Sequence, residues 1–369
     1  MPTDAPGPRP APSVTAPPHG GEGAPDPARA LRRIAFLLEW QGASPYRVRA
    51  FHTAAEAVRG LPPGPVDAER ARRLPGVGPV TSEVIAQAST GRTPPYLARL
   101  EEQAGPAAAA GWALAAAARG DCHLHSDWSD GGHPFEEMAA AARDLGHDWA
   151  VLTDHSPRLT VAHGLSPERL EEQLDAVAAW NARNGPFRLL TGIECDILED
   201  GSLDQRPELL DRLDLVVASV HSKLRSEPGP MTARMLAAVR HPRTNVLGHC
   251  TGRIITGRGR PPSGFDAEEV FTACAASGTA VEVNCRPERR DPPDDLLRLA
   301  AEAGCLFAVD TDAHAPDQLH WLTSGYARTA RLGLGPERLV TTWTRERLLE
   351  WTGGPRGAER PRRTGRPRA

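Results

Sequence analysis

The chain has 369 residues, of which 40% are hydrophobic, and its formal net charge is −4. This length is typical of two domains rather than one, and the charge excludes a basic field over the whole surface that would attract nucleic acid. The six cysteines form no C-x-x-C pair, and no apolar run approaches the roughly 20 residues that span a bilayer. We therefore expect a cytoplasmic protein with reduced thiols and without a membrane partner.

Residues 1–27 are rich in Pro, Gly and Ala and almost free of large apolar side chains. Such a segment cannot bury enough surface to offset the entropy lost on ordering, so we expect it to be disordered. Residues 29–103 have a helical pattern instead, because Leu31, Ile34 and Leu38 recur at helical spacing. This second segment is expected to be a small all-α domain.

A short glycine-rich turn lies inside the helical segment and is typical of a helix-hairpin-helix. Gly76 and Gly78 would let backbone N–H groups approach a DNA phosphate, and the following helix N-terminus adds a favourable dipole. Arg47 and Arg49 on a preceding helix add positive charge. Turns of this kind also join helices in proteins that never contact DNA, and Pro79 removes one N–H donor. The turn favours DNA as a partner but leaves a purely structural role open.

The Ala-rich residues 104–118 are expected to form a short helical linker, and the pattern changes after them. Over residues 119–352, apolar runs of a few residues alternate with longer helical stretches, which is typical of a parallel α/β barrel or wound sheet. Seven such runs are predicted to be strands: Cys122–Leu124, Trp149–Thr153, Arg188–Ile193, Leu215–Val220, Asn245–Gly248, Thr279–Val283 and Leu306–Thr311.

Potential metal ligands follow six of these seven runs. In a parallel barrel the carboxyl ends of the strands lie on one face, where active sites form. Alternation along a strand also directs both side chains of an H-x-H or D-x-H pair to the same side. Imidazole and carboxylate ligands together suit zinc, manganese or iron. The predicted ligands are His123, His125, Asp130, His155, Glu194, His221, His249, Asp312 and His314.

Several of these segments resemble motifs of the polymerase-and-histidinol-phosphatase (PHP) family, in the order in which the family has them. They are DCHLHSDWSDG, VLTDHS, GIECDIL, ASVHS, LGHCTGR, VEVNCRPERRD and DTDAH. The likeness is greatest to the C-terminal PHP domain of bacterial family X DNA polymerases. The segment from SPYRVRAFHTAAEAV to LPGVG is similar to the helical DNA-binding domain at the start of those polymerases. The linker has no room for their nucleotidyltransferase domain, so we expect no polymerase activity.

The resemblance implies a seven-stranded distorted (β/α) barrel that holds two to three divalent ions (Zn²⁺, Mn²⁺ or Fe²⁺). His123, His125, Glu194 and Asp312 would hold the first ion. Glu194 would bridge to a second ion held by His221 and His249. Asp130, His155 and His314 would hold the third.

Three further residues are candidates for roles around these ions. Asp154 is expected to orient a ligand histidine, and Arg253 and Arg286 to bind phosphate oxygens, although both arginines fit a solvated loop equally well. Glu194, Asp154 and Arg253 form the predicted catalytic set. The arginine-rich residues 353–369 are expected to be a disordered tail that either solubilises the chain or contacts phosphate backbones.

The sequence therefore predicts a metal-dependent hydrolase of phosphate esters, because clustered divalent ions activate water and neutralise phosphoryl charge. The leading hypothesis is a 3′–5′ DNA exonuclease or phosphodiesterase linked to DNA repair, since the helical domain favours DNA. The alternative is a histidinol-phosphatase-like enzyme acting on small phosphomonoesters. A catalytically idle DNA-binding protein is the third hypothesis, and the full ligand set argues against it.

Overall fold

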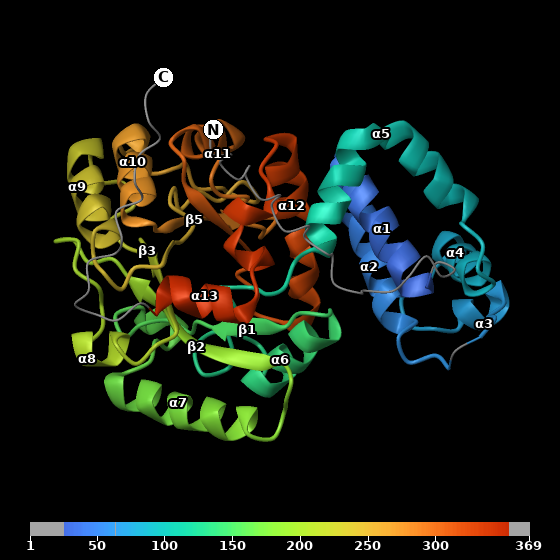
Figure 1. The fold of residues 1–369 in the computed structure, drawn as a ribbon, viewed down its shortest axis with the longest axis horizontal. Coiled ribbons are helices and arrows are strands. Elements are labelled where there is room, and N and C mark those ends of the chain that lie inside the picture. The colour runs from blue at the N-terminus through green and yellow to red at the C-terminus, as the bar shows by residue number, and fades with distance from the viewer. Residues whose placement is uncertain (1–25, 63, 354–369) are drawn as a thin grey trace, which may run out of the picture.

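The computed structural model describes residues 26–62 and 64–353. Most of the N-terminal segment and almost all of the basic tail expected to be disordered lie outside these residues. The first part of the chain folds into helices, which Figure 1 shows beside the larger α/β part. They are α1 (Pro27–Trp40), α2 (Pro45–Ala57), α3 (Ala68–Arg72), α4 (Pro79–Ser89) and α5 (Pro95–Ala116).

Helix α1 begins at Pro27, which is the last residue of the segment expected to be disordered. The Asp26 carboxylate accepts a hydrogen bond from the Arg29 N–H at 3.1 Å, and Pro27 suits the first helical position. Leu31, Ile34 and Leu38 are then buried, as their spacing predicts. These three side chains belong to the apolar core of the helical domain.

Helix α5 joins the two parts of the chain. It contains the predicted linker 104–118 up to Ala116, and it bends at Gly105, which has a φ of 70° and precedes Pro106. Its second half packs against helix α12 (Leu322–Arg331) while also contacting α1. A Cβ atom at Gly111 would lie 2.9 Å from Phe36 Cζ and 3.1 Å from Ala330 Cβ, so a glycine is needed for this close approach.

The α/β part contains a parallel sheet in which consecutive strands are neighbours, in the order β1 to β6. This arrangement confirms the expected fold class. The strands are β1 (Trp149–Leu152), β2 (Arg188–Asp196), β3 (Leu215–Ser219), β4 (Val246–Leu247), β5 (Ala280–Asn284) and β6 (Leu306–Asp310).

The first of the seven predicted strands is reduced to isolated bridges. Leu124 makes parallel bridges to Leu152, at the end of β1, and to Ala313, just after β6. The chain cannot extend this strand because it turns at Ser126, whose carbonyl accepts a hydrogen bond from the Gly131 N–H at 2.9 Å. The bridges nonetheless place this segment between the two edge strands and curl the sheet.

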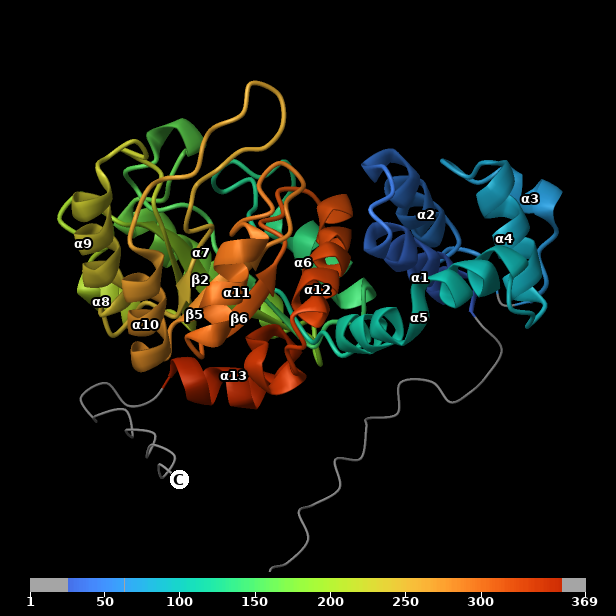
Figure 2. The ribbon, with the colours of Figure 1, turned by 90° about the horizontal axis from the view of Figure 1, so that it is seen from above.

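Helices surround the curled sheet in both views (Figures 1 and 2). They are α6 (Phe135–Asp144), α7 (Pro167–Asn181), α8 (Pro207–Leu210), α9 (Pro228–Val239), α10 (Ala267–Ser277), α11 (Asp294–Glu302), α12 and α13 (Arg345–Thr352). Short 3₁₀ helices are Thr160–Ala162, Pro316–Trp321, Pro336–Arg338 and Val340–Thr342. Within the described ranges, no helix is both long enough and apolar enough to cross a membrane.

The amino end of the sheet is filled with apolar side chains. The Trp149 indole N–H, at the start of β1, donates to the Trp343 carbonyl oxygen at 3.1 Å. Trp343, which precedes α13, and Leu348 within α13 belong to the apolar cluster that covers this end.

The helical domain and the α/β domain meet through a polar contact as well as through α5. The imidazole rings of His52 and His320 stack with centroids 4.8 Å apart. His320 Nε2 lies 3.3 Å from the Glu56 carboxylate, and Arg290 lies 3.4 Å from the Glu39 carboxylate. Both histidines are largely buried. Charged and titratable groups from both domains therefore share one interface.

Candidate metal centre

The nine predicted ligands converge at the carboxyl end of the sheet. Alternation along β2 turns Ile193 and Cys195 outward to the surrounding helices, whereas Glu194 faces inward. Its carboxylate lies at the centre of five histidines, three near Oε2 and two near Oε1. The distances are His123 Nε2 3.3 Å, His125 Nε2 3.5 Å, His155 Nδ1 3.0 Å, His221 Nε2 3.2 Å and His249 Nε2 2.9 Å.

The remaining two carboxylates complete the cluster. Asp130 Oδ1 lies 3.4 Å from both His155 Nε2 and His314 Nε2, and Asp312 Oδ1 lies 3.5 Å from His125 Nε2. The Asp312–His314 pair does not continue a strand as predicted, because β6 ends at Asp310 and Asp312 has a φ of 53°. This left-handed turn, rather than strand alternation, directs the pair into the cluster.

The donors fit divalent metal ions. Among the buried imidazole nitrogens that lack a hydrogen-bond partner within the described chain are four that face the cluster: His123 Nε2, His125 Nε2, His155 Nδ1 and His221 Nε2. An unpaired buried polar atom is costly, and a metal ion would satisfy it. Three sets of donors are close enough to share an ion: His125, Asp130, His155 and His314; His123, His125 and Glu194; and His155, Glu194 and His221.

Two carboxylates that we did not predict orient the histidines from behind. Glu282 lies 2.6 Å from His123 Nδ1, and Asp196 lies 2.7 Å from His221 Nδ1. A carboxylate on one imidazole nitrogen fixes the tautomer and leaves the other nitrogen free for a metal. Glu282 carried a sequence signal, since it is a charged residue inside an apolar strand. Asp196 did as well, because it lies two residues after Glu194 on the same strand.

The electrostatics of the cluster favour cations. Burial raises the pKa of Glu194, but the charges of His123, His221 and His155 outweigh burial and hold it well below its ordinary value. Burial lowers the pKa of His155, whereas Glu194 and Asp130 raise it to about 10. Protons therefore compete with metal ions for the same nitrogens, and metal binding is expected to weaken as the pH falls.

Asp154 does not have the predicted role. Its carboxylate accepts hydrogen bonds from the hydroxyls of Ser126 (2.7 Å) and Ser129 (2.5 Å) and from the Gln173 amide (2.7 Å), rather than from a ligand histidine in the part of the chain that is described. The turn after His125 places the Ser126 and Ser129 hydroxyls against the Asp154 carboxylate, so its oxygens are already occupied. Asp154 therefore fixes the loop that carries His125 and Asp130.

Arg253 is also placed differently from the prediction of a phosphate clamp. Its guanidinium donates hydrogen bonds to the carbonyl oxygens of Arg289, at 3.0 Å, and Arg290. Those bonds hold the loop after β5. The arginines that reach the cluster are Arg286 and Arg289, which lie 3.3 Å and 3.2 Å from the Asp312 carboxylate oxygens. Residue type and spacing alone do not distinguish an arginine that binds a loop from one that faces the cluster.

A cavity of about 610 Å³ opens above the cluster. Asp130, Glu194 and His221 lie on its lining, and so do Arg286 and Arg289. Two guanidinium groups next to a group of metal ligands can bind phosphate oxygens in a planar, bidentate manner. The cavity therefore suits a phosphate ester.

The predicted DNA-binding residues lie on the helical domain, away from this cluster in sequence. Gly76 has a φ of 71° and packs on the Thr53 side chain, and the Gly78 N–H donates to Thr81 Oγ1 at 2.9 Å. Arg47 and Arg49 are both exposed. Arg47 also donates a hydrogen bond to the Tyr96 hydroxyl at 2.9 Å.

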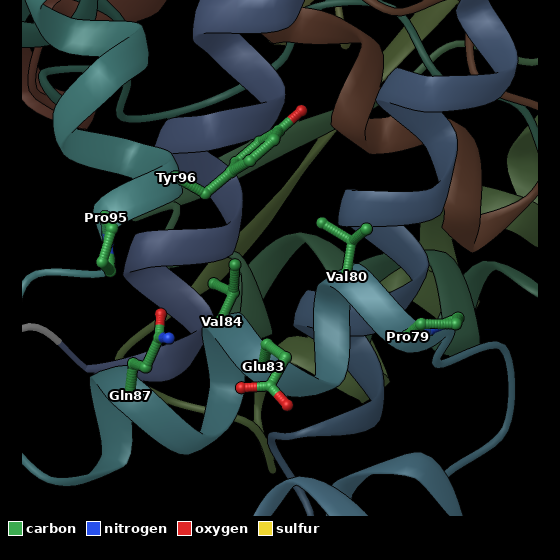
Figure 3. A pocket seen from close by; sticks show the side chains of 7 residues that line it. All are labelled: Pro79, Val80, Glu83, Val84, Gln87, Pro95 and Tyr96. Carbon is green, nitrogen blue, oxygen red and sulfur yellow. The ribbon is translucent and has the colours of Figure 1, made fainter.

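A second cavity, of about 380 Å³, lies beside the hairpin between α4 and the start of α5. Figure 3 shows Val80 and Val84 of α4 opposite Pro95 and Tyr96 of α5. Because the Gly78 N–H is already used inside the hairpin, the exposed arginines remain the more available groups for binding phosphate.

Comparison with known families agrees with this architecture. Residues 22–93 match the helix-hairpin-helix domain, and residues 121–284 match the PHP domain. The chain therefore carries a helix-hairpin-helix domain ahead of a PHP domain. Fold, ligand cluster and matched domain together define a metal-dependent phosphoesterase.

Individual relatives differ in the functions that their names state. The chain is 37% identical over 207 residues to "DNA polymerase/3'-5' exonuclease PolX" of Bacillus subtilis (strain 168), which covers 56% of this chain but only 36% of that protein. It is 28% identical over 248 residues to a "Probable phosphatase" of Syntrophotalea carbinolica, covering 63% of this chain and 95% of the relative. A histidinol phosphate phosphatase of Lactococcus lactis, solved with zinc, L-histidinol and phosphate, aligns with a TM-score of 0.43 and 19% identity over 59% of this chain and 94% of its own.

Proposed function

We propose that the chain is a metal-dependent phosphodiesterase that removes nucleotides from DNA ends in the 3′–5′ direction, in the context of DNA repair, and that it does not polymerise DNA. The observation that supports this proposal is the packing of a helix-hairpin-helix domain directly against the PHP domain through α5 and α12. A dedicated phosphomonoesterase has no evident need for such a domain. The similarity to an exonuclease from Bacillus subtilis adds support.

The residues of the chain divide the reaction among them. Divalent ions held by the cluster would supply Lewis acidity that acidifies water and offsets phosphoryl charge. Arg286 and Arg289 orient the phosphate, because both line the cavity beside Asp312. Glu282 and Asp196 keep the nitrogens of His123 and His221 turned toward the ions. Positioning and charge, more than side-chain acid–base chemistry, would lower the barrier.

We expect purified protein, stripped with a chelator and reloaded with Mn²⁺ or Zn²⁺, to shorten 3′-labelled and 5′-labelled single-stranded DNA from the 3′ end. The same preparation should incorporate no nucleotide on a primed template. Product ladders on denaturing gels measure the shortening of DNA and any nucleotide incorporation. A parallel panel of phosphomonoesters measures phosphatase activity. Efficient phosphomonoester hydrolysis with intact DNA at every metal concentration would contradict the DNA proposal.

The second candidate function is hydrolysis of a small phosphomonoester. It is favoured by one observation, the alignment over 95% of the length of a relative named as a phosphatase. In that case the helical domain would bind another partner, and DNA would not compete with the small substrate.

DNA binding by the helical domain makes a separate prediction. Replacing the exposed Arg49 by alanine should weaken binding of single-stranded DNA, because each bound phosphate releases counterions. The slope of log affinity against log salt should fall by about 0.7–0.9 for each phosphate that the variant no longer binds. Fluorescence anisotropy at several salt concentrations measures the slope. Arg183→Ala, at an exposed position just after α7, is the matched control, and equal slopes for both variants would refute the assignment.

A further inference from the structure

The cavity above the metal ligands has two chemically different walls. One wall carries the ligands and the two arginines described above. The other is apolar and is formed by Leu159, Val161, Ala162 and Ile254. A phosphate group needs only the first wall, and 610 Å³ is more space than a phosphate fills. The second wall must therefore face another part of the substrate.

One residue of the apolar wall, Val161, is largely exposed. Val161 is 87% exposed and is one of four large hydrophobic side chains that are exposed among residues 26–62 and 64–353. Its backbone is nevertheless held, because the Ala162 N–H donates to the Leu159 carbonyl at 3.0 Å and Arg169 donates to the His163 carbonyl at 2.7 Å. This held backbone therefore presents the Val161 side chain at the cavity in a fixed position.

The segment that carries Ile254 is held by backbone hydrogen bonds as well. Ile254 pairs with Arg260 in an antiparallel bridge, and the next residue, Ile255, donates its N–H to the Glu288 carbonyl at 2.7 Å. Ile254 lines the cavity, and Ile255 is 51% exposed beside it. We call Val161 and Ile254 the apolar rim.

We propose that the apolar rim packs against an unpaired nucleobase next to the phosphate that is cleaved. The proposal rests on the proposed DNA function. The two arginines and the metal ligands bind the negative phosphate, and the branched aliphatic side chains of the rim can pack against the face of a base that has left the stack. The Glu288 side chain, half exposed on the cavity lining, can accept a hydrogen bond from a base N–H group but would repel a second phosphate.

The decisive comparison is between a normal and an abasic 3′-terminal nucleotide on the same single-stranded oligonucleotide. We expect the unchanged protein to have a KM about tenfold higher for the abasic end, because that end has no base to lie on the rim. In the double variant V161A/I254A the two KM values should become equal. Hydrolysis of glycerol phosphate, measured as released phosphate, should be unchanged, since that substrate has no ring to lie on the rim.

Ile255→Ala is the matched control, because it removes the same side chain from the neighbouring exposed position. It should preserve the preference for the normal end. The rim proposal is overturned if the unchanged protein treats both ends alike, or if V161A/I254A keeps the preference. If no DNA is cut but glycerol phosphate is hydrolysed, the DNA function fails, and comparing a nucleoside monophosphate with ribose phosphate still tests the rim.

Discussion

Replacing Glu194 by alanine is expected to lower the rate of metal-dependent ester hydrolysis by about 100- to 1000-fold, the usual cost of removing one preorganised catalytic interaction. The reason is its position, since five histidines lie within 3.5 Å of its two oxygens. Loss of the carboxylate would remove one ligand from each of two of the three donor sets. Steady-state rates on a chromogenic phosphate ester at saturating Mn²⁺ measure the effect.

Glu288→Gln provides the control for Glu194→Ala. Glu288 also lines the cavity, but its side chain is 49% exposed and its carboxylate lies near Arg286 rather than among the ligands. We expect this variant to hydrolyse the small ester at close to the unchanged rate. Near-normal turnover by Glu194→Ala would show that the central carboxylate does not organise the reaction.

Replacing Glu282 by glutamine should weaken metal binding by about 10- to 100-fold, as is usual for residues that orient ligands from behind. Glu282 accepts from the His249 backbone N–H while it contacts His123 Nδ1 at 2.6 Å. A glutamine can present an oxygen to only one of these groups, so its amide N–H₂ must face the other. Metal affinity is measured by competition with a fluorescent chelator.

A positioning role for Glu282 has a signature that simple misfolding lacks. Excess metal should restore most of the turnover of Glu282→Gln, because the ligands themselves are intact. The thermal unfolding midpoint without metal serves as the folding control. An unchanged metal affinity, or a loss of turnover that excess metal leaves in place, would contradict the role assigned to Glu282.

The sequence predicted the convergence of the ligands well, because the rule used is geometric. Parallel strands have their carboxyl ends on one side, so residues that follow β1, β3, β4 and β6, or that lie near the end of β2, must approach one another. Pairing between particular side chains is a different matter. Glu282 and His123 are 159 residues apart, and no spacing within a single strand reveals which distant nitrogen a carboxylate will meet.

The wrong predictions share a physical cause, which is local competition for hydrogen bonds. Asp154 is adjacent to His155 in the sequence, yet serine hydroxyls of the 126–129 turn reach its oxygens. Arg253 follows a ligand strand, yet nearby backbone carbonyls bind its guanidinium. Residue type and distance from a strand end predicted a location at the site. The conformation of the loops decided which group each residue serves.

The stacked histidines between the two domains make their contact responsive to acid. Burial and the charge of Arg32 lower the pKa of His52 to about 4 from its ordinary value of 6.5, and burial holds the pKa of His320 well below that value. Below pH 6.5 these two histidines, one on each domain, take up protons in the separated domains that they do not take up in the docked ones. Docking therefore weakens as the pH falls from about 6.5 toward 4, and above that range it is insensitive to these two groups. Protonation of His52 and His320 thus competes with the docking of the two domains.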